Sequence, residues 1–336
     1  MESITRRFQI CFPRLLCLIA LSLLLSSAGH GQSGQKPEAL TSLPCTTRTG
    51  LHCEIYGHGE PILFLHGLGG NTYSWRYMKE PLAHYYQVIL IDFRGEGKSP
   101  KPHDKHYSLE DQSELIYQFI VEHNLQRLTL VGNSYGGAVS LLLAIRLCAE
   151  TDSRLAKLVL IDPGAYADHL PLFLIILRTP VLGWLAVHIL PPALQILIVL
   201  FQSYYDPAKI TLKQIRKYAK PIASRGGRWA LLQIGKGAIP KDLAYYIKLY
   251  PTISVPTLIL WGEDDHVLRR DVATRLHDAI KGSELKYIKY AGHIPQEEEP
   301  GPVVCRIKAF LMPNIICPPQ TQPSVNPRRS NGRSRF

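Results

Sequence analysis

Short apolar runs alternate with longer stretches of helical period from Pro61 to Leu311, and this alternation constrains the fold more than any other feature. Six of the runs have the length of a buried strand, and each is followed by a loop with polar or glycine residues: Ile62 to Leu65, Val88 to Ile91, Leu128 to Val131, Leu158 to Ile161, Thr257 to Trp261 and Leu285 to Ile288. Strands separated by helices pair in parallel, because each helix carries the chain back along the sheet. The sequence therefore predicts an α/β fold with a mostly parallel central sheet and flanking helices.

One predicted crossover helix has a recognisable start between the second and third apolar runs. Ser108 and Asp111 have the spacing of a capping box. Apolar residues then recur on one helical face, at Leu109, Leu115, Ile116, Phe119 and Ile120. A helix at this place is what a parallel arrangement of the two flanking strands requires.

The alternation stops between about Ala165 and Ser254, where the chain is helical in period, apolar and interrupted by proline. Pro180, Pro191 and Pro192 divide the apolar stretch from Leu170 to Phe201 into pieces too short to span a bilayer. We interpret residues 165–254 as a helical cap over an apolar cavity. The cap is inserted between two parts of the predicted core, residues 30–164 and 255–312.

The predicted cap is also basic. It holds eleven Lys and Arg residues against three Asp, and the whole chain has a formal net charge of +11, so most of the excess charge lies here. A surface that is both apolar and cationic suits peripheral contact with anionic lipid or attraction of an acidic substrate, whereas a solvated basic helix face is the alternative explanation. No nucleic-acid-binding motif accompanies the charge, so we predict no nucleic-acid partner.

The two ends of the chain differ from the predicted core. Two arginines precede an apolar run from Leu15 to Leu25, and small residues up to Ala28 follow it, which is the pattern of a secretory signal peptide. We predict that residues 1–29 direct export, to a periplasm or out of the cell; the alternative is an uncleaved segment that anchors the protein in a membrane. Residues 313–336 are rich in Pro, Ser, Asn and Arg, which predicts a disordered basic tail.

Export implies an oxidising compartment, in which cysteines form disulfides. Removal of the predicted signal leaves Cys45, Cys53, Cys148, Cys305 and Cys317, an odd number that leaves at least one thiol free. Cys45 and Cys53 flank a turn signal, so in a hairpin they lie close enough for a bridge; otherwise they are two unpaired thiols. The chain has no CxxC pair and no histidine cluster at ligand spacing, so we predict no metal and no cofactor.

The string Gly132-Asn133-Ser134-Tyr135-Gly136-Gly137 follows a predicted strand and precedes a helical stretch that ends at Cys148. In a sharp strand-to-helix turn of this kind the serine hydroxyl is lifted above the sheet, and Gly132 and Gly136 let the strand and the helix approach closely. The string alone is also compatible with a small-residue turn and an idle serine. Ser134 is the candidate nucleophile, and it requires a base and an orienting carboxylate.

Candidates for both partners lie later in the chain. A predicted strand runs into the acidic turn Glu263-Asp264-Asp265, and His293 follows the next strand, so the order Ser, Asp, His is met. With these residues the chain resembles the α/β-hydrolase fold family over nearly everything from Cys53 to Leu311. In that family the acid usually falls third after the turn glycine, which implies Asp265 as the acid in preference to its two acidic neighbours. The resemblance implies Ser134 as nucleophile and His293 as base.

A second motif, His66-Gly67-Leu68-Gly69-Gly70, follows the first predicted strand and resembles the family's HG motif, whose loop supplies a backbone N–H to a developing oxyanion. The resemblance implies that the Leu68 N–H acts in this way together with the Tyr135 N–H. The last two glycines would let the backbone approach a substrate carbonyl, or they mark a merely flexible loop. We expect His66 to be structural, and we interpret Asp92 to Ser99 as a structural turn.

The resemblance implies a serine hydrolase with a small hydrophobic substrate. An ester is the simplest choice, and the apolar cap favours a hydrophobic acyl or alcohol group, as in a carboxylesterase or a monoacylglycerol-lipase-like enzyme. The alternative is a carbon–carbon bond hydrolase of the meta-cleavage type, because Asn133 completes a GNSxGG string that those relatives share, although they commonly carry Trp where this chain has Ile294. Ser134 argues against epoxide and haloalkane hydrolases, which use aspartate. A non-catalytic binding protein on the same fold is the remaining reading.

Overall fold

The computed structural model describes residues 41–43, 45, 47–150 and 154–320. The predicted signal segment, residues 1–29, lies outside the described residues, as does the tail from residue 321 onward.

Seven strands form one central sheet in the order β1-β3-β2-β4-β5-β6-β7. β1 is antiparallel to β3, and all the other neighbours are parallel. The strands are β1 (Cys53–Tyr56), β2 (Pro61–Leu65), β3 (Gln87–Ile91), β4 (Leu128–Asn133), β5 (Leu155–Ile161), β6 (Thr257–Gly262) and β7 (Glu284–Ile288). The predicted α/β fold with a mostly parallel sheet is confirmed, and all six predicted strands are present.

The two edges of the sheet differ from the prediction. β1 was not predicted as a strand of this sheet, because its four residues include Glu54 and do not form a continuous apolar run. β7 was predicted as a buried strand, yet its residues from Glu284 to Tyr287 are exposed or half-buried and only Ile288 is buried. β7 lies at the end of the sheet, so it has a neighbouring strand on one side only.

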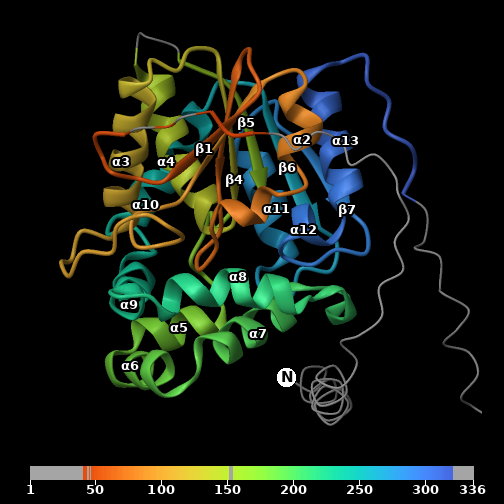
Figure 1. Cartoon of the computed structure of the whole chain (residues 1–336). Helices are drawn as coiled ribbons and strands as arrows, with labels where there is room; N and C mark the ends of the chain where they lie inside the picture. Colours follow the sequence, from red (N-terminus) through yellow and green to blue (C-terminus); the bar gives the residue numbers. More distant parts are fainter. Residues whose placement is uncertain (1–40, 44, 46, 151–153, 321–336) are drawn as a thin grey trace, which may run out of the picture. The chain divides into compact units, whose positions relative to one another are not determined.

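Helices cover both faces of the sheet (Figure 1). One face carries α3 (Leu109–Glu122), α4 (Tyr135–Ala149) and α11 (Arg270–Ala279), and the other carries η1 (Thr72–Trp75), α2 (Lys79–Ala83) and α13 (Pro300–Leu311). Alternate residues of β2 supply the two cores, Leu63 and Leu65 to the first and Ile62 and Phe64 to the second. The predicted capping box between Ser108 and Asp111 begins α3.

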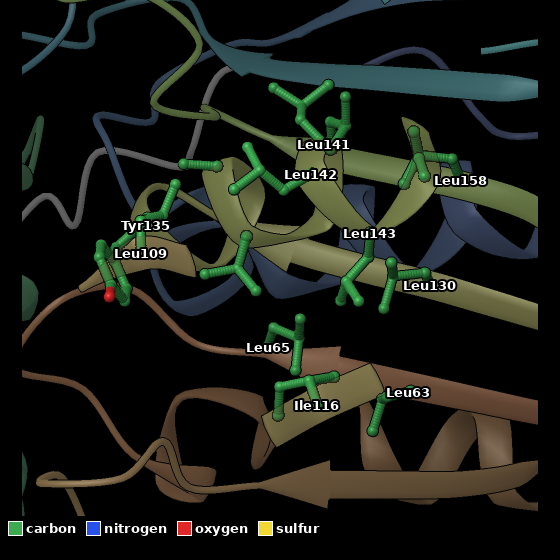
Figure 2. Close-up of a cluster of buried hydrophobic side chains, with 14 of the residues drawn as sticks. Leu63, Leu65, Leu109, Ile116, Leu130, Tyr135, Leu141, Leu142, Leu143 and Leu158 are labelled. Carbon is green, nitrogen blue, oxygen red and sulfur yellow. The ribbon is translucent and has the colours of Figure 1, made fainter. Parts of the chain in front are cut away.

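The helix after the candidate nucleophile is the most deeply packed element of the first face. α4 is buried along most of its length, including the run from Leu141 to Leu143. Figure 2 shows these leucines beside Leu130 of β4 and Leu158 of β5, with Ile116 of α3 closing the cluster. A helix so enclosed has little freedom to shift, because its side chains are close-packed against their neighbours. For the same reason, large-to-small substitutions there cost about 2 to 5 kcal/mol each. The N-terminal residue of α4 is therefore held in place relative to β4.

Between β5 and β6 the described chain holds helices and no strand. The elements are α5 (Leu172–Arg178), α6 (Pro180–Ile189), α7 (Pro192–Ser203), η2 (Pro207–Lys209), α8 (Leu212–Ala223), α9 (Gly227–Gly237), α10 (Leu243–Leu249) and η3 (Tyr250–Thr252). Pro180 and Pro192 stand at the first residues of α6 and α7, as the predicted division of this stretch requires. Residues of α5 to α9 share an apolar core of their own, which includes Leu177, Val187 and Leu200.

The end of this insertion belongs to the core instead. Tyr250 and Ile253 are buried in the same cluster as α4, and the Tyr250 hydroxyl donates to the carbonyl of Ala165 at 2.7 Å. Residues just before the predicted cap boundary at Ser254 thus pack with the core, as Ala230 and Ile234 of α9 also do. Sequence patterning did not separate the two parts, because both are helical and apolar.

Among the described residues no single helix is both long and apolar enough to cross a bilayer. α5 and α6 taken together have the required length and composition, but they bend by 107° where they join.

Two disulfides are present in the described chain, and Cys148 is a free thiol. Cys45 pairs with Cys53, which selects the bridged alternative for this pair. Cys305 of α13 pairs with Cys317, within the predicted tail. Residues 313–320, which we assigned to the predicted disordered tail, are joined to α13 by this bridge, although none of their side chains is buried.

We expect the double substitution of Cys305→Ser and Cys317→Ser to lower the free energy of unfolding by about 2 to 3 kcal/mol, because the bridge restricts the unfolded chain. Urea unfolding under non-reducing conditions measures this, with Cys148→Ser as the control that removes a thiol but no bridge. Equal unfolding midpoints for the double variant and the native chain would contradict the stabilising role of the bridge.

Candidate active site

Ser134 occupies a strained turn between β4 and α4. Its φ of 52° and ψ of −113° place a residue with a side chain in a region that non-glycine residues rarely adopt. The flanking glycines explain how the turn is enforced: a Cβ at position 136 would lie 2.2 Å from the carbonyl oxygen of Leu65, and one at 132 would lie 2.3 Å from that of Gly136. Close approach of helix and strands holds Ser134 in this conformation.

The structure brings together the three residues predicted as nucleophile, base and acid. Ser134 Oγ lies 2.7 Å from His293 Nε2, and His293 Nδ1 lies 2.8 Å from Asp265 Oδ2. They follow β4, β7 and β6, so all three come from loops at the carboxyl ends of parallel strands. The side chains of His293 and Asp265 are nearly inaccessible to solvent, at 6% and 1% exposure. Each proton-transfer partner is thus held within hydrogen-bond distance and shielded from water.

The geometry distinguishes Asp265 from its acidic neighbours. Asp265 Oδ2 faces the imidazole, while Oδ1 accepts hydrogen bonds from the backbone N–H groups of Val267 and Leu268. Glu263 is exposed. Asp264 contacts the histidine loop through its backbone N–H, which donates to the carbonyl of Ala291. Of the three acids, Asp265 is the one placed to orient His293.

Hydrogen bonds to three residues, Ser203, Asn133 and Glu298, fix the loop that carries His293. The His293 N–H donates to the carbonyl of Ser203 at the end of α7, at 2.7 Å. The Asn133 amide donates to the carbonyls of His293 and Ile161, and the N–H of Gly292 donates to the Glu298 carboxylate. Asn133, predicted as a supporting residue of the elbow, therefore links the nucleophile turn to the histidine loop.

Two buried acids after His293 were missed by sequence reasoning. They belong to α12 (Pro295–Glu298), where a run of Glu residues is expected to be exposed. Glu298 accepts from the N–H groups of Tyr205, Asp206 and Gly292, so it joins the histidine loop to the chain after α7. Glu297 accepts from Tyr218 and pairs with Arg76 at 2.6 Å. Only partners distant in sequence make this burial favourable, so no local signal reveals it.

His66, for which we expect a structural role, contacts backbone groups through both of its ring nitrogens. It is buried, its Nε2 accepts from the Phe93 N–H at 3.3 Å, and its Nδ1 lies 2.8 Å from the carbonyl of Gly67. Burial lowers the pKa of His66, and the two partners suit a neutral ring protonated on Nδ1. The ring thus fixes the start of the loop that contains Leu68.

A buried carboxyl supports the same loop from the turn after β3. Glu96 Oε1 accepts from the N–H of Gly69, and burial raises the pKa of Glu96 to about 8. Asp92 accepts from the N–H groups of Thr72 and Lys98, which agrees with the structural role predicted for this turn. Gly70 closes the loop by donating to the carbonyl of Gly67. These contacts position the backbone of Leu68 at the edge of the pocket that Ser134 lines.

Tyr135, the other predicted oxyanion residue, is the first residue of α4. The first N–H groups of a helix have no acceptor within the helix, so the Tyr135 N–H is available to a bound group beside Ser134. Its side chain packs away from this site, against Phe93 with ring centroids 5.5 Å apart.

A pocket opens beside Ser134 and His293, with an empty volume of about 580 Å³ that includes space open to solvent. One part of its lining is apolar, from Leu68, Phe173, Ile196, Val199, Leu200 and Ile294. Another part is polar and includes Ser74, Tyr218 and Glu297. The described lining residues include no Lys or Arg. The apolar insertion helices thus form a wall of the cavity into which Ser134 points.

Asp162, at the end of β5, is a buried acid beside the orienting carboxylate. Its Oδ1 accepts from the N–H of Gly262 at 2.9 Å, whereas its Oδ2 has no partner as a carboxylate. Burial raises the pKa of the Asp162 carboxyl well above its usual range, and the charge of Asp265 raises it further. A proton on Oδ2 would be donated to Asp265, so we interpret Asp162 as a neutral carboxyl that supports the acid.

Asp162, Asp265 and His293 also form the one group among the described residues whose candidate metal-ligand atoms gather, all within 4.8 Å of one another. His293 and Asp265 already satisfy each other through a short hydrogen bond. The third member, Asp162, is the carboxyl that we interpret as neutral, and a protonated carboxyl is a poor metal ligand.

This chain is similar to a family of known proteins and to several hydrolases. A family model described as alpha/beta hydrolase fold matches residues 60–300. A 2-hydroxy-6-oxononadienedioate/2-hydroxy-6-oxononatrienedioate hydrolase from Cupriavidus pinatubonensis is 27% identical over 274 residues, which cover 78% of this chain and 92% of the relative. Lipase 3 from Moraxella sp. is 26% identical over 269 residues, with coverage of 75% and 77%. A thermophilic esterase structure from Thermogutta terrifontis has a TM-score of 0.65 and 25% identity, with coverage of 82% and 98%.

The raised pKa of Asp162 predicts a pH dependence of stability. The unfolded chain has an ordinary aspartate with a pKa of about 3.9, so above that value the native state keeps a proton that the unfolded state has lost. Stability therefore falls as pH rises toward the raised native pKa. In Asp162→Asn the amide can make both hydrogen bonds without this cost, so the variant should gain stability relative to the native chain as pH rises, by at most about 1.4 kcal/mol per pH unit.

Urea unfolding of both proteins at several pH values between about 5 and about 8 measures the difference. Asp278→Asn, at an exposed position, is the matched control and should give a pH-independent offset. Parallel stability curves for Asp162→Asn and the native chain would contradict the neutral carboxyl.

Proposed function

We propose a function on the premise that this chain belongs to the alpha/beta hydrolase fold family, whose model matches residues 60–300. The relatives named above are hydrolases, which supports an enzyme of that class. The proposed enzyme is a serine hydrolase that cleaves a carboxylic ester with a hydrophobic acyl or alcohol group, as a carboxylesterase or a monoacylglycerol-lipase-like enzyme does.

The observation that carries the proposal is the hydrogen-bonded series from Ser134 through His293 to Asp265. A serine hydroxyl becomes a nucleophile when a base takes its proton, and the imidazolium that forms is stabilised by a carboxylate. Ser134 Oγ attacks the ester carbonyl carbon while His293 Nε2 accepts the hydroxyl proton. His293 then gives this proton to the alcohol oxygen, so that the alcohol leaves and Ser134 carries the acyl group. Water, deprotonated by His293, hydrolyses the acyl-enzyme.

Two backbone N–H groups are proposed to hold the negative charge that develops on the carbonyl oxygen. They belong to Leu68, in the loop after β2, and to Tyr135, the first residue of α4 and the neighbour of Ser134. Donors fixed by Glu96, His66 and the N-terminus of α4 need no reorganisation when the charge appears, and one such donor is worth about 10² to 10³ in rate.

The pocket lining supports an uncharged ester more than the carbon–carbon bond alternative. The name of the Cupriavidus relative denotes dicarboxylate substrates. A dianion calls for cationic partners, whereas the described lining residues of this pocket include Glu297 and no Lys or Arg. Asn133, which suggested the alternative, already donates to two backbone carbonyls and needs no substrate contact to explain it.

We further propose that the protein works in an oxidising compartment, reached by the export predicted from residues 1–29. The two disulfides of the described chain support this location, because such bridges persist outside the reducing cytosol.

A series of p-nitrophenyl esters of rising acyl length tests the function. We expect kcat/KM to rise by about tenfold or more from acetate to hexanoate, because each buried methylene contributes up to about 0.8 kcal/mol. Ser134→Ala should lose the activity. No preference beyond acetate would contradict the hydrophobic ester. Faster turnover of a meta-cleavage dienoate than of any ester would favour the carbon–carbon alternative, and activity that survives Ser134→Ala would overturn the serine mechanism.

A pair of α7 variants tests whether this pocket sets the preference. Val199 lines the pocket, whereas Ile198 beside it is exposed. Val199→Phe should reduce kcat/KM for the longer esters and spare acetate, because the larger ring occupies the acyl space. Ile198→Phe should leave the profile unchanged.

A further inference from the structure

Exposed apolar side chains gather on three neighbouring helices of the insertion. Of the eighteen large hydrophobic residues that are exposed in the described chain, nine lie on α5, α6 and α7. We call them the apolar face: Leu172, Ile175, Val181, Leu182, Trp184, Leu185, Ile189, Leu194 and Ile198. Scattered exposed hydrophobics are ordinary, but a gathering of this kind marks a surface that meets an apolar partner.

The opposite sides of the same helices are buried. Leu177 of α5, Val187 of α6 and Leu200 of α7 lie in the core shared by the insertion helices. α5 and α6 both pack on α9 and bend by 107° where they join. In Figure 1 these helices lie on the side of the insertion away from the central sheet. The apolar face is thus the outer surface of folded helices, which suits contact with a bilayer surface.

A stripe of cations runs along the adjacent helix, α8, which packs against α7. Lys213, Arg216, Lys217 and Lys220 are exposed and follow the spacing of one helical face. No ion pair joins any of these four side chains to an acidic group in the described chain. Between Asp168 and Asp242 the sequence has a single acidic residue, Asp206. The stripe is therefore an uncompensated positive charge beside the apolar face.

We propose that the apolar face docks on an anionic lipid bilayer, with the basic stripe of α8 against the lipid phosphates. Interfacial helices bind in this way, with apolar side chains below the headgroups and cations at their level. A second copy of this chain fits less well, because the same surface of that copy would offer the stripe almost no acidic groups, Asp206 being the single one between Asp168 and Asp242. The docking does not depend on the chemistry at Ser134.

Trp184 supplies a local probe of this contact. It is half exposed on the apolar face, whereas Trp75 and Trp261 are fully buried and Trp229 is half-buried on α9. With vesicles of brominated phosphatidylcholine and phosphatidylglycerol, bromine quenches indoles that enter the acyl region. We expect the full chain to lose Trp184 emission on these vesicles and Trp184→Phe to show little quenching. Because the readout is at α6, an N-terminal anchor cannot produce it.

Two pairs of variants test the apolar and cationic parts. Val181 and Ile189 are 69% and 67% exposed, so Val181→Ser with Ile189→Ser should keep the fold and reduce Trp184 quenching at a fixed lipid concentration by about tenfold. Tyr85→Ser with Val121→Ser, at exposed positions outside the insertion, is the matched control.

Lys213→Gln with Lys220→Gln should weaken docking by about fivefold or more and reduce its salt dependence. Lys281→Gln with Lys289→Gln, at exposed positions outside the insertion, is the matched control and should change neither the docking nor its salt dependence.

Quenching of Trp184 that requires anionic lipid and falls in both test pairs supports the docking. Native chain that sediments with the vesicles without quenching of Trp184 would overturn it, as would equal quenching on neutral phosphatidylcholine vesicles. A dimer in sedimentation equilibrium that Val181→Ser with Ile189→Ser abolishes, together with unquenched Trp184, would instead assign the apolar face to self-association.

Discussion

The site depends on the close packing of α4 against the sheet. Gly136 lies so near the carbonyl of Leu65 that no side chain fits, and the leucines of α4 are enclosed by β4, β5 and α3. Packing of this density leaves Ser134 with a backbone conformation that costs about 1 to 3 kcal/mol and that the surrounding core maintains. The strained turn directs the hydroxyl toward the carboxyl ends of the strands, where the loops after β6 and β7 arrive.

A second set of contacts converts proximity into alignment. Two backbone N–H groups hold Asp265, and the neutral Asp162 that we infer beside it adds a third donor. Asn133, Ser203 and Glu298 hold the loop of His293. Ser203 ends α7, and two of the Glu298 partners, Tyr205 and Asp206, directly follow it, so the helix that lines the pocket also helps to fix the candidate base. Pocket shape and catalytic geometry are thus two properties of one packed unit.

The sequence was sufficient for features that local patterns encode. Buried strands appear as apolar runs, the turn at Ser134 as glycines around a serine, and the insertion as a loss of alternation. Features that depend on distant partners were not predictable: the pairing of β1 with β3, the burial of Glu297 and Glu298, the raised pKa of the Asp162 carboxyl, and the bridge from Cys305 to Cys317. The choice of Asp265 over Asp264 required family resemblance, because adjacent carboxylates differ only in where the folded turn points them.

Labelling of Ser134 by a fluorophosphonate is the decisive experiment, because this probe reacts with an activated serine whatever the natural substrate is. We expect stoichiometric modification at Ser134 and none in Ser134→Ala. The labelling rate should fall by up to about 10⁴-fold in Asp265→Asn and stay at the native value in Asp264→Asn. A native chain that resists the probe, or one whose reactivity depends on Asp264 and not on Asp265, would contradict the proposed serine mechanism.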